Sequence, residues 1–203
     1  MFRLICLAIG YAIGCIQTAF IMGKLCKTDL SKKGSGNLGT TNALRVLGFK
    51  AGAVTFIGDI LKGVVSFLVA SWIFPDQAFL AGIYGCAGTI LGHDFPFYLH
   101  FKGGKGIAAT IGMVLCIGLT QSWQLLAVSY IIGLGAAVVT KYISVGSILF
   151  SVCICASAWV FGLPVEAAVV LTALSALALW KHRSNMKRLL EGNENKFTLT
   201  KKV

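Results

Sequence analysis

Long apolar stretches alternate with very short polar connections along most of this chain. The apolar runs fall at about 2–23, 51–74, 78–95, 106–120, 125–140, 143–161 and 165–180. A helix perpendicular to a membrane needs about 20 apolar residues, so some runs are short, although flanking residues can extend them. The pattern predicts an all-α protein, a polytopic transmembrane helical bundle of about seven membrane-spanning helices. Five long spans are the alternative.

The composition supports a membrane protein. Of the 203 residues, 57% are hydrophobic and 12% are charged, about half the charged fraction of a typical soluble domain. The first apolar run is too long for a cleaved signal peptide and is followed by Lys24, Lys27, Lys32 and Lys33, a stop-transfer pattern. We expect residues 1–203 to form a single integral-membrane domain.

Basic residues predict the orientation of the chain. With seven spans, all of the 18 Lys and Arg residues except Arg3 and Lys62 fall on one side, the last of them in the tail that runs from Lys181 to Lys202. That side is predicted to be cytosolic, with the N-terminus outside and the C-terminus inside. The net charge of +11 favours anionic lipid headgroups and anionic substrates as partners. We expect no nucleic-acid partner, because the spans leave no soluble basic domain.

Three polar stretches hold most of the polar chemistry of a chain with only 7 acidic residues and 3 histidines. They are Ser35–Asn42 with Arg45 behind it, Phe101–Gly106, and His182–Glu194. All three fall on the predicted cytosolic side.

The second stretch, Lys102-Gly103-Gly104-Lys105-Gly106, is the sharpest signal. Glycines allow backbone N–H groups to crowd around an anion, and the lysines add charge. The apolar run that follows predicts a helix N-terminus, which also favours an anion. The spacing is not that of a Walker A motif. A flexible loop with topology-setting lysines is the alternative.

The first stretch combines glycines with neutral hydrogen-bonding groups. If a helix begins here, Asn42 and Arg45 share a face of it, and arginine offers a planar fork for phosphate oxygens. The alternative is a helix-capping segment, because Asn and Thr favour caps.

The third stretch places His182, Asn185 and Arg188 three residues apart. On a helix, consecutive members lie close together. Gly192 is predicted to end that helix, and Glu194 to pair with a neighbouring cation. An amphipathic segment lying on the membrane surface is the alternative.

The remaining polar residues are given structural roles. Asp59 and Lys62 lie inside the second apolar run and are predicted to form an ion pair facing the bundle interior. Asp94 is expected to be solvated near a span end, and His93 and His100 to be interfacial, with one of the two histidines lining the site as the alternative. The cysteines are expected to act as small hydrophobes, with no disulfide and no metal site. The glycines of Gly10-x-x-x-Gly14 and Gly82-x-x-Gly85-x-x-Gly88 are expected to pack helices closely.

Some reaction classes lack their signatures. There is no G-x-S-x-G elbow, and no histidine is followed five residues later by Asp, as in many acyl-CoA-dependent glycerolipid acyltransferases. The acidic residues are too scattered for a two-metal site. What remains is a site built from phosphate-binding groups with one His, one Asn and one Ser.

Taken together, the three motifs resemble the PlsY family, the bacterial acylphosphate:glycerol-3-phosphate acyltransferases. The family carries S-G-N-x-G-x-T-N followed by Arg, then F-K-G-G-K-G, then H-x-x-N-x-x-R-L-x-x-G-x-E, and this chain has all three in order. It departs from the family at Gln17, where Pro is frequent, and at Thr40, where Ala is usual. Both departures concern local geometry and not a residue assigned to chemistry.

The resemblance implies an enzyme of the bacterial inner membrane with its active site on the cytosolic face. It implies transfer of a fatty acyl group from acyl phosphate to the sn-1 hydroxyl of glycerol 3-phosphate, giving lysophosphatidic acid and inorganic phosphate. The substrates and membrane lipid are then the partners, no cofactor or metal is needed, and the protein is expected to be a monomer.

The motif residues are assigned to this reaction as follows. The catalytic residues are predicted to be Ser35, Arg45, Lys105, His182 and Asn185. The substrate-binding residues are predicted to be Asn37, Thr41, Asn42, Lys102, Gly103, Gly104, Gly106 and Arg188. Because acyl phosphate is already activated, we expect direct transfer without an acyl-enzyme.

Two alternatives from other classes remain at this stage. An organic-phosphate transporter or channel could use the same loops, although no internal repeat is visible and all motifs fall on one side. A non-catalytic membrane scaffold would leave the three phosphate-suited loops unexplained.

Overall fold

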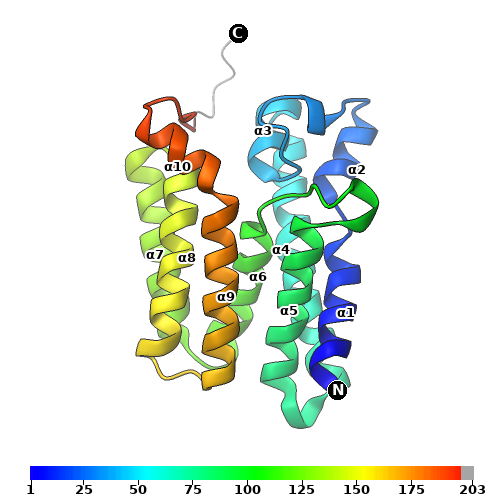
Figure 1. Cartoon of the computed structure of the whole chain (residues 1–203), viewed down its shortest axis with the longest axis vertical. Coiled ribbons are helices and arrows are strands. Elements are labelled where there is room, and N and C mark those ends of the chain that lie inside the picture. The colour runs from blue at the N-terminus through cyan, green and yellow to red at the C-terminus, as the bar shows by residue number, and fades with distance from the viewer. Residues whose placement is uncertain (198–203) are drawn as a thin grey trace. The chain divides into compact units, whose positions relative to one another are not determined.

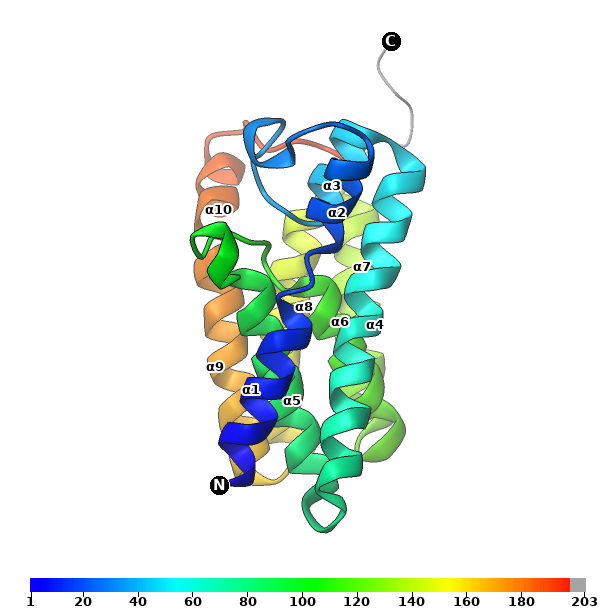
Figure 2. The same ribbon diagram turned by 90° about the vertical axis from the view of Figure 1, so that its right-hand side faces the viewer.

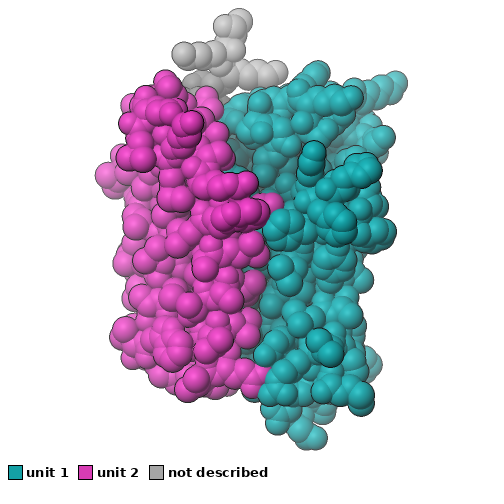
Figure 3. All heavy atoms as spheres, in the orientation of Figure 1, with its two compact units in different colours: residues 1–116 teal, residues 117–203 magenta. Residues whose placement is uncertain are grey.

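The computed structural model describes residues 1–197, which contain helices and no strand. The prediction of an all-α protein is confirmed. Lys201 and Lys202, which were counted with the basic tail, lie outside the described residues. The chain divides into two compact units, residues 1–116 and 117–203, with the boundary inside one helix (Figure 3). The single-domain organisation therefore stays a prediction.

The first unit is built on three long helices that run side by side (Figure 1). Its elements are α1 (Phe2–Gly14), α2 (Thr18–Leu25), η1 (Leu30–Lys32), α3 (Thr40–Leu47), α4 (Phe49–Ile73), η2 (Pro75–Gln77), α5 (Ala78–Asp94), η3 (Phe97–Leu99) and most of α6 (Ile107–Thr120), the helix that contains the boundary. Helix α5 packs against both α1 and α4. The connections that carry the first two motifs lie at the end of this unit opposite the N-terminus (Figures 1 and 2).

Glycines bring α1 and α5 into backbone contact. A Cβ at Gly10 would overlap the carbonyl oxygen of Gly85, and one at Gly88 would overlap that of Leu7. Small residues permit this close approach, which is the main source of helix association where lipid replaces water. The predicted packing role of these glycines is confirmed.

The first apolar run is interrupted, a feature that the hydrophobic pattern did not predict. Helix α1 ends at Gly14 and α2 begins at Thr18, with Gln17 extended at φ −90° and ψ 94°. A break inside an apolar segment leaves carbonyl groups that need donors from neighbouring helices. Gln17 and Lys62 both donate to the carbonyl of Gly14, Lys62 also donates to that of Ile16, and the Tyr98 hydroxyl donates to that of Cys15.

The second unit is also a packed set of helices: α7 (Trp123–Thr140), α8 (Ile143–Val160), α9 (Val165–Lys181) and α10 (Arg183–Leu190). Helix α8 packs against α7 and α9. Gly133 of α7 faces Phe150 and Gly146 of α8, so small residues again allow a close crossing. Helices α9 and α10 meet at an angle of 50°.

Four segments of the described chain are long and apolar enough to cross a membrane: Phe2–Leu25, Phe49–Ile73, Trp123–Thr140 and Ile143–Val160. The bent pair α9 and α10 would be a fifth. Large apolar side chains such as Ile57, Leu68 and Trp72 are exposed along α4, and Ile131 and Val139 along α7. Such faces suit contact with lipid, so this is an integral membrane protein; the count of seven spans stays a prediction, because α5 and α6 are shorter.

Candidate active site

The first polar loop is braced by the side chain of Asn42. The Asn42 amide donates to the carbonyl oxygens of Leu30 and Lys33, both at 3.1 Å, and its Oδ1 accepts from the N–H of Ser35 at 2.9 Å. The side chain is almost fully buried, at 2% exposure. Asn42 therefore holds the loop in shape, and Ser35 lies on the exposed part of this loop.

Helix α3 begins within the first motif, which is the condition under which Asn42 and Arg45 were expected to share a face. Thr40 is its first residue, Thr41 its second, and Arg45 lies exposed in its last turn, three residues after Asn42. The Thr40 hydroxyl is buried and has no hydrogen-bond partner among the described residues. Since the resembled family usually has Ala at this position, the hydroxyl is an additional buried polar group in this chain.

The second polar loop is tied to the end of α5. Gly103 and Gly104 donate their N–H groups to the carbonyls of Asp94 and His93, at 3.2 and 3.0 Å. These two N–H groups therefore hold the loop, which differs from the expectation that they surround an anion. Gly106 then adopts φ +70°, a conformation that favours glycine, and α6 begins at the next residue, as predicted.

The first two motifs meet within the first unit. The Asn37 amide donates to the carbonyl of Gly103 at 3.5 Å, and Leu99 of η3 packs against the apolar cluster that includes Leu38 and Ala43. Lys105 is half-buried and Lys102 is exposed on the same loop. Two segments about 65 residues apart in sequence thus form one polar surface with basic side chains.

Beneath the second loop lies a buried polar cluster. Lys62 Nζ is 2.9 Å from Asp59 Oδ1 and 2.6 Å from His93 Nδ1. The Thr18 hydroxyl donates to the same Asp59 oxygen at 3.2 Å. The ion pair predicted for Asp59 and Lys62 is confirmed.

Two expectations about the end of α5 are wrong. His93 was expected to be interfacial and Asp94 to be solvated, but they are 3% and 0% exposed. The second loop covers both: Gly104 lies on His93, and Gly106 lies beside the Asp94 carboxylate. The sequence did contain a signal for buried polar residues on a neighbouring helix, because an ionisable pair inside an apolar run, here Asp59 and Lys62, requires polar partners from other helices.

The third motif forms its own cluster in the second unit. His182 lies at the bend between α9 and α10 and is 4% exposed. Its Nδ1 is 2.8 Å from the carbonyl oxygen of Ala178. Because a carbonyl only accepts hydrogen bonds, Nδ1 carries the proton, and in the neutral ring Nε2 carries the lone pair.

Glu194 joins the other members of this motif. It accepts from Asn185 at 2.7 Å and Ser144 at 3.0 Å on one oxygen, and from Arg188 at 2.7 Å on the other. Burial would raise the pKa of Glu194, but the three hydrogen bonds and the Arg188 charge together hold the pKa below its usual value. The predicted pairing of Glu194 with a cation is confirmed.

The end of α10 also follows the prediction. Gly192 adopts φ +71°, its N–H donates to Leu189, and the N–H of Asn193 donates to Arg188. This is the Schellman arrangement, in which a left-handed glycine closes the helix. The turn returns the chain so that Glu194 reaches back to Asn185 and Arg188.

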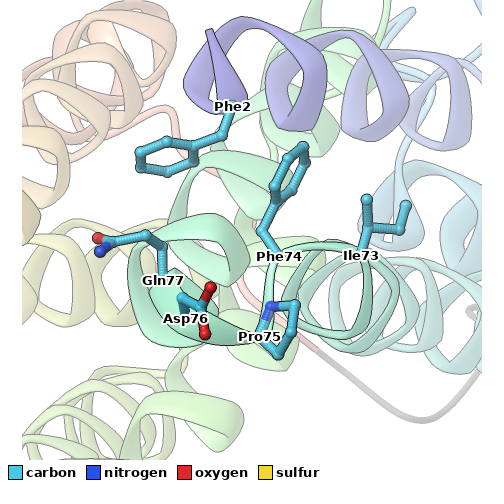
Figure 4. Close-up of a pocket in the computed structure, with 6 residues that line it drawn as sticks. All are labelled: Phe2, Ile73, Phe74, Pro75, Asp76 and Gln77. Atoms are coloured by element: carbon cyan, nitrogen blue, oxygen red, sulfur yellow. The ribbon is translucent and has the colours of Figure 1, made fainter.

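A separate shallow hollow in the first unit contains none of the predicted site residues. It is lined by Phe2, Ile73, Phe74, Pro75, Asp76 and Gln77 (Figure 4). It has one acidic and no basic side chain, so it is poorly suited to a phosphate. It lies at the N-terminal end of α1, away from both motif loops of that unit (Figure 1).

Comparison with known proteins places this arrangement in a family. The family model for glycerol-3-phosphate acyltransferase matches residues 4–192. A glycerol-3-phosphate acyltransferase of Thermoanaerobacter pseudethanolicus is 41% identical over 198 residues, covering 97% of this chain and 96% of its own. One from Endomicrobium trichonymphae is 36% identical and covers 100% and 99%.

A solved structure is similar over nearly the whole chain. The crystal structure of PlsY (YgiH), described as an integral membrane glycerol 3-phosphate acyltransferase in its glycerol 3-phosphate form, superposes with a TM-score of 0.87. It is 33% identical and covers 97% of this chain and 96% of its own. The lysophosphatidic acid form gives a TM-score of 0.84 at 32% identity.

Proposed function

The chain belongs to the glycerol-3-phosphate acyltransferase family and is a membrane acyltransferase, and on this premise we propose its acyl donor, product and mechanism. The donor is acyl phosphate, the acceptor is the sn-1 hydroxyl of glycerol 3-phosphate, and the products are lysophosphatidic acid and inorganic phosphate. The family is one of enzymes, which decides against the transporter and scaffold alternatives.

An acyl phosphate suits the groups available. Phosphate is a good leaving group, so the enzyme has to hold two phosphates, orient a hydroxyl and stabilise charge, without a covalent intermediate. The observation that carries the proposal is the meeting of the Ser35–Asn42 loop with the lysine-containing 102–106 loop through Asn37 and Gly103. Together they present hydroxyl and amide groups beside two lysines.

We assign the roles in the first unit from this geometry. Arg45 offers its fork to a phosphate, and Lys105 balances the charge on the departing phosphate. Ser35 positions a substrate by hydrogen bonding, while Asn42 acts through the loop that it braces. Asn37, Thr41 and Lys102 form the rest of the proposed binding surface, and Gly103, Gly104 and Gly106 shape the loop that carries the two lysines.

In the second unit, His182 and Asn185 are assigned to the attacking hydroxyl and the acyl carbonyl. The bond from Nδ1 to the Ala178 carbonyl fixes the orientation of the His182 ring, and we assign this ring to orienting the attacking hydroxyl. Glu194 accepts from the Asn185 amide nitrogen and from Arg188, so it orients both side chains. Arg188 is assigned to substrate binding through the part of its guanidinium that Glu194 leaves open.

The enzyme is proposed to lie in the bacterial inner membrane with its active site facing the cytosol, to act as a monomer and to use no cofactor. The basic residues around the first two motifs support this orientation. Glycerol 3-phosphate is a soluble dianion and would approach a basic face favourably.

The direct test is phosphate release by purified protein from a synthetic acyl phosphate, with and without glycerol 3-phosphate. Release should require glycerol 3-phosphate, and acyl-CoA should not replace the donor. Lys105→Ala should lower turnover by about a hundredfold. Lys187→Ala is the matched control, because the Lys187 side chain is 77% exposed and, within residues 1–197, its salt bridge is to Glu191 at 3.8 Å. Equal turnover with acyl-CoA would contradict the proposed donor.

Direct transfer leads to a prediction about Ser35. Ser35→Ala should lose activity by a factor of about 10² through misplacement of a substrate. Wild-type enzyme quenched after mixing with acyl phosphate alone should show no added acyl mass in mass spectrometry. A kinetically competent adduct on Ser35 would replace direct transfer with a ping-pong mechanism.

A further inference from the structure

The buried cluster of Asp59, Lys62 and His93 has no part in the mechanism above, yet it reaches the second phosphate loop. Its three side chains are 2%, 6% and 4% exposed. Burying charged groups inside an apolar helix bundle is costly, so such groups commonly serve function. The ring of His93 is the member that faces the loop.

Lys62 determines how the imidazole of His93 is held. Within the described part of the chain, the other hydrogen-bonding partners of Lys62 Nζ are acceptors, namely Asp59 Oδ1 at 2.9 Å and the carbonyls of Gly14 and Ile16 at 3.4 and 3.3 Å. An ammonium group only donates hydrogen bonds. His93 Nδ1, 2.6 Å away, must therefore accept, which places the ring proton on Nε2.

The opposite edge of the ring supports Gly104. A Cβ at residue 104 would overlap Nε2 of His93 and lie 2.7 and 2.8 Å from Cε1 and Cδ2. The main-chain carbonyl of His93 also accepts the Gly104 N–H at 3.0 Å. One residue thus holds Gly104 by both its backbone and its ring, and Lys105 is the next residue in the loop.

We propose that His93 is a positioning residue for the acyl-transfer site. The Asp59–Lys62 pair fixes the imidazole through Nδ1, and the Nε2 edge sets the path of the loop that carries Lys105. The proposal rests on the function proposed above, and it assigns His93 no contact with substrate. It also changes the reason why residue 104 must be glycine: a methyl group there would strike the His93 ring, whereas the sequence suggested that glycine lets backbone N–H groups surround an anion.

Two substitutions separate the two contacts of the ring. In His93→Asn, the amide oxygen of the new side chain can still accept a hydrogen bond from Lys62, but the side chain is too short to reach Gly104. In His93→Gln, the new side chain can reach Gly104 but has no acceptor at the position of Nδ1. His93→Asn should therefore keep its Tm in detergent within a few degrees while kcat falls about tenfold or more. For His93→Gln the Tm should fall further than for His93→Asn, whereas kcat per folded molecule should fall less.

A double-mutant cycle gives a readout that does not require turnover. Gly104→Ala should lower the Tm markedly in the wild-type background and much less in the His93→Asn background, because the ring that the methyl group would strike is gone. Additive Tm changes, or a kcat that simply follows Tm across all variants, would overturn the positioning role.

The ring tautomer can be measured in the full-length protein. The sequence has 3 histidines, so ¹⁵N spectra of histidine-labelled protein can be assigned with His93→Asn and His100→Asn. His93 should show a protonated Nε2 and an unprotonated Nδ1; the reverse tautomer would overturn the proposal. Absence of acyl transfer in the wild type would overturn the proposed function as well, whereas normal transfer with additive Tm changes would overturn this inference alone.

Discussion

Arg45 illustrates how much of the proposed chemistry depends on side-chain shape. It is exposed in the last turn of α3, so its guanidinium is open to solvent and not packed in the protein core. Arg45→Lys keeps the charge but loses the planar pair of donors. We expect the KM for glycerol 3-phosphate to rise about tenfold, since a hydrogen bond to a charged group contributes about 1.5–3 kcal/mol.

The control for this prediction is Lys50→Arg, which alters an exposed cation at the start of α4. Its KM should equal that of the wild type. Wild-type kinetics in Arg45→Lys would remove Arg45 from the site.

Glu194 gives a prediction about pH. Its pKa is held below the usual value of 4.5 in the folded protein. A depressed folded pKa contributes stability that is present above the unfolded pKa and is lost as the pH falls through the folded value. The Tm difference between wild type and Glu194→Gln should therefore be constant above about pH 5 and shrink on further acidification.

Glu191→Gln is the matched control, because Glu191 is exposed and lies 3.8 Å from Lys187. An exposed pair of this kind contributes little, so its Tm should differ little from the wild type. A Tm difference for Glu194→Gln that grows at low pH would contradict the hydrogen-bonding account.

At the scale of elements, the turn after α10 decides whether Glu194 can reach Asn185 and Arg188. A Cβ at Gly192 would meet no atom within 4 Å, but the φ angle of Gly192 is +71°. Any loss of unfolding free energy in Gly192→Ala therefore comes from the backbone conformation alone. We expect destabilisation of about 1–2 kcal/mol, measured by unfolding in detergent.

Gly135 is the control position, because an added Cβ has as much room there as at Gly192. It lies inside α7, also has no atom within 4 Å of an added Cβ, and has no left-handed φ. Gly135→Ala should be neutral or slightly stabilising. If both substitutions had the same effect, the left-handed turn would not be the cause.

The break between α1 and α2 shows how one element positions another. Gln17 donates to the carbonyl of His93 at 3.0 Å as well as to those of Gly14 and Gly92. The interrupted helix is therefore bonded to the end of α5, where the second loop is attached. The Pro found here in the resembled family would suit the extended backbone but could not donate to α5.

At the scale of the whole molecule, the natural cysteines can test the predicted orientation. Cys26, in the basic connection after α2, is exposed, whereas the other six are buried or half-buried within the described residues. A membrane-impermeant maleimide should label wild-type protein in inside-out vesicles and not in right-side-out vesicles. Cys26→Ser should abolish the labelling, and labelling in right-side-out vesicles would reverse the predicted topology.

Much of this protein can be predicted from its sequence, because the relevant signals are local. Apolar runs predict helices, since a lipid environment requires every backbone group to be paired within its own segment. The starts of α3 and α6, the ion pair of Asp59 with Lys62 and the glycine that ends α10 follow from spacings of a few residues. The three motifs are also contiguous, so their resemblance to one enzyme family could be recognised without a structure.

Only the tertiary structure decided which groups meet across long sequence separations. Nothing local indicated that Asn42 braces the loop of Ser35, that Lys62 holds the carbonyls of an interrupted α1, or that His93 lies beneath Gly104. A buried hydrogen-bonding group must find a partner, but sequence does not say which one. For Lys62 and His93 the packing of α1, α4 and α5 made that choice, because the close approach of these helices at their glycines brought the two side chains within hydrogen-bonding distance of their partners.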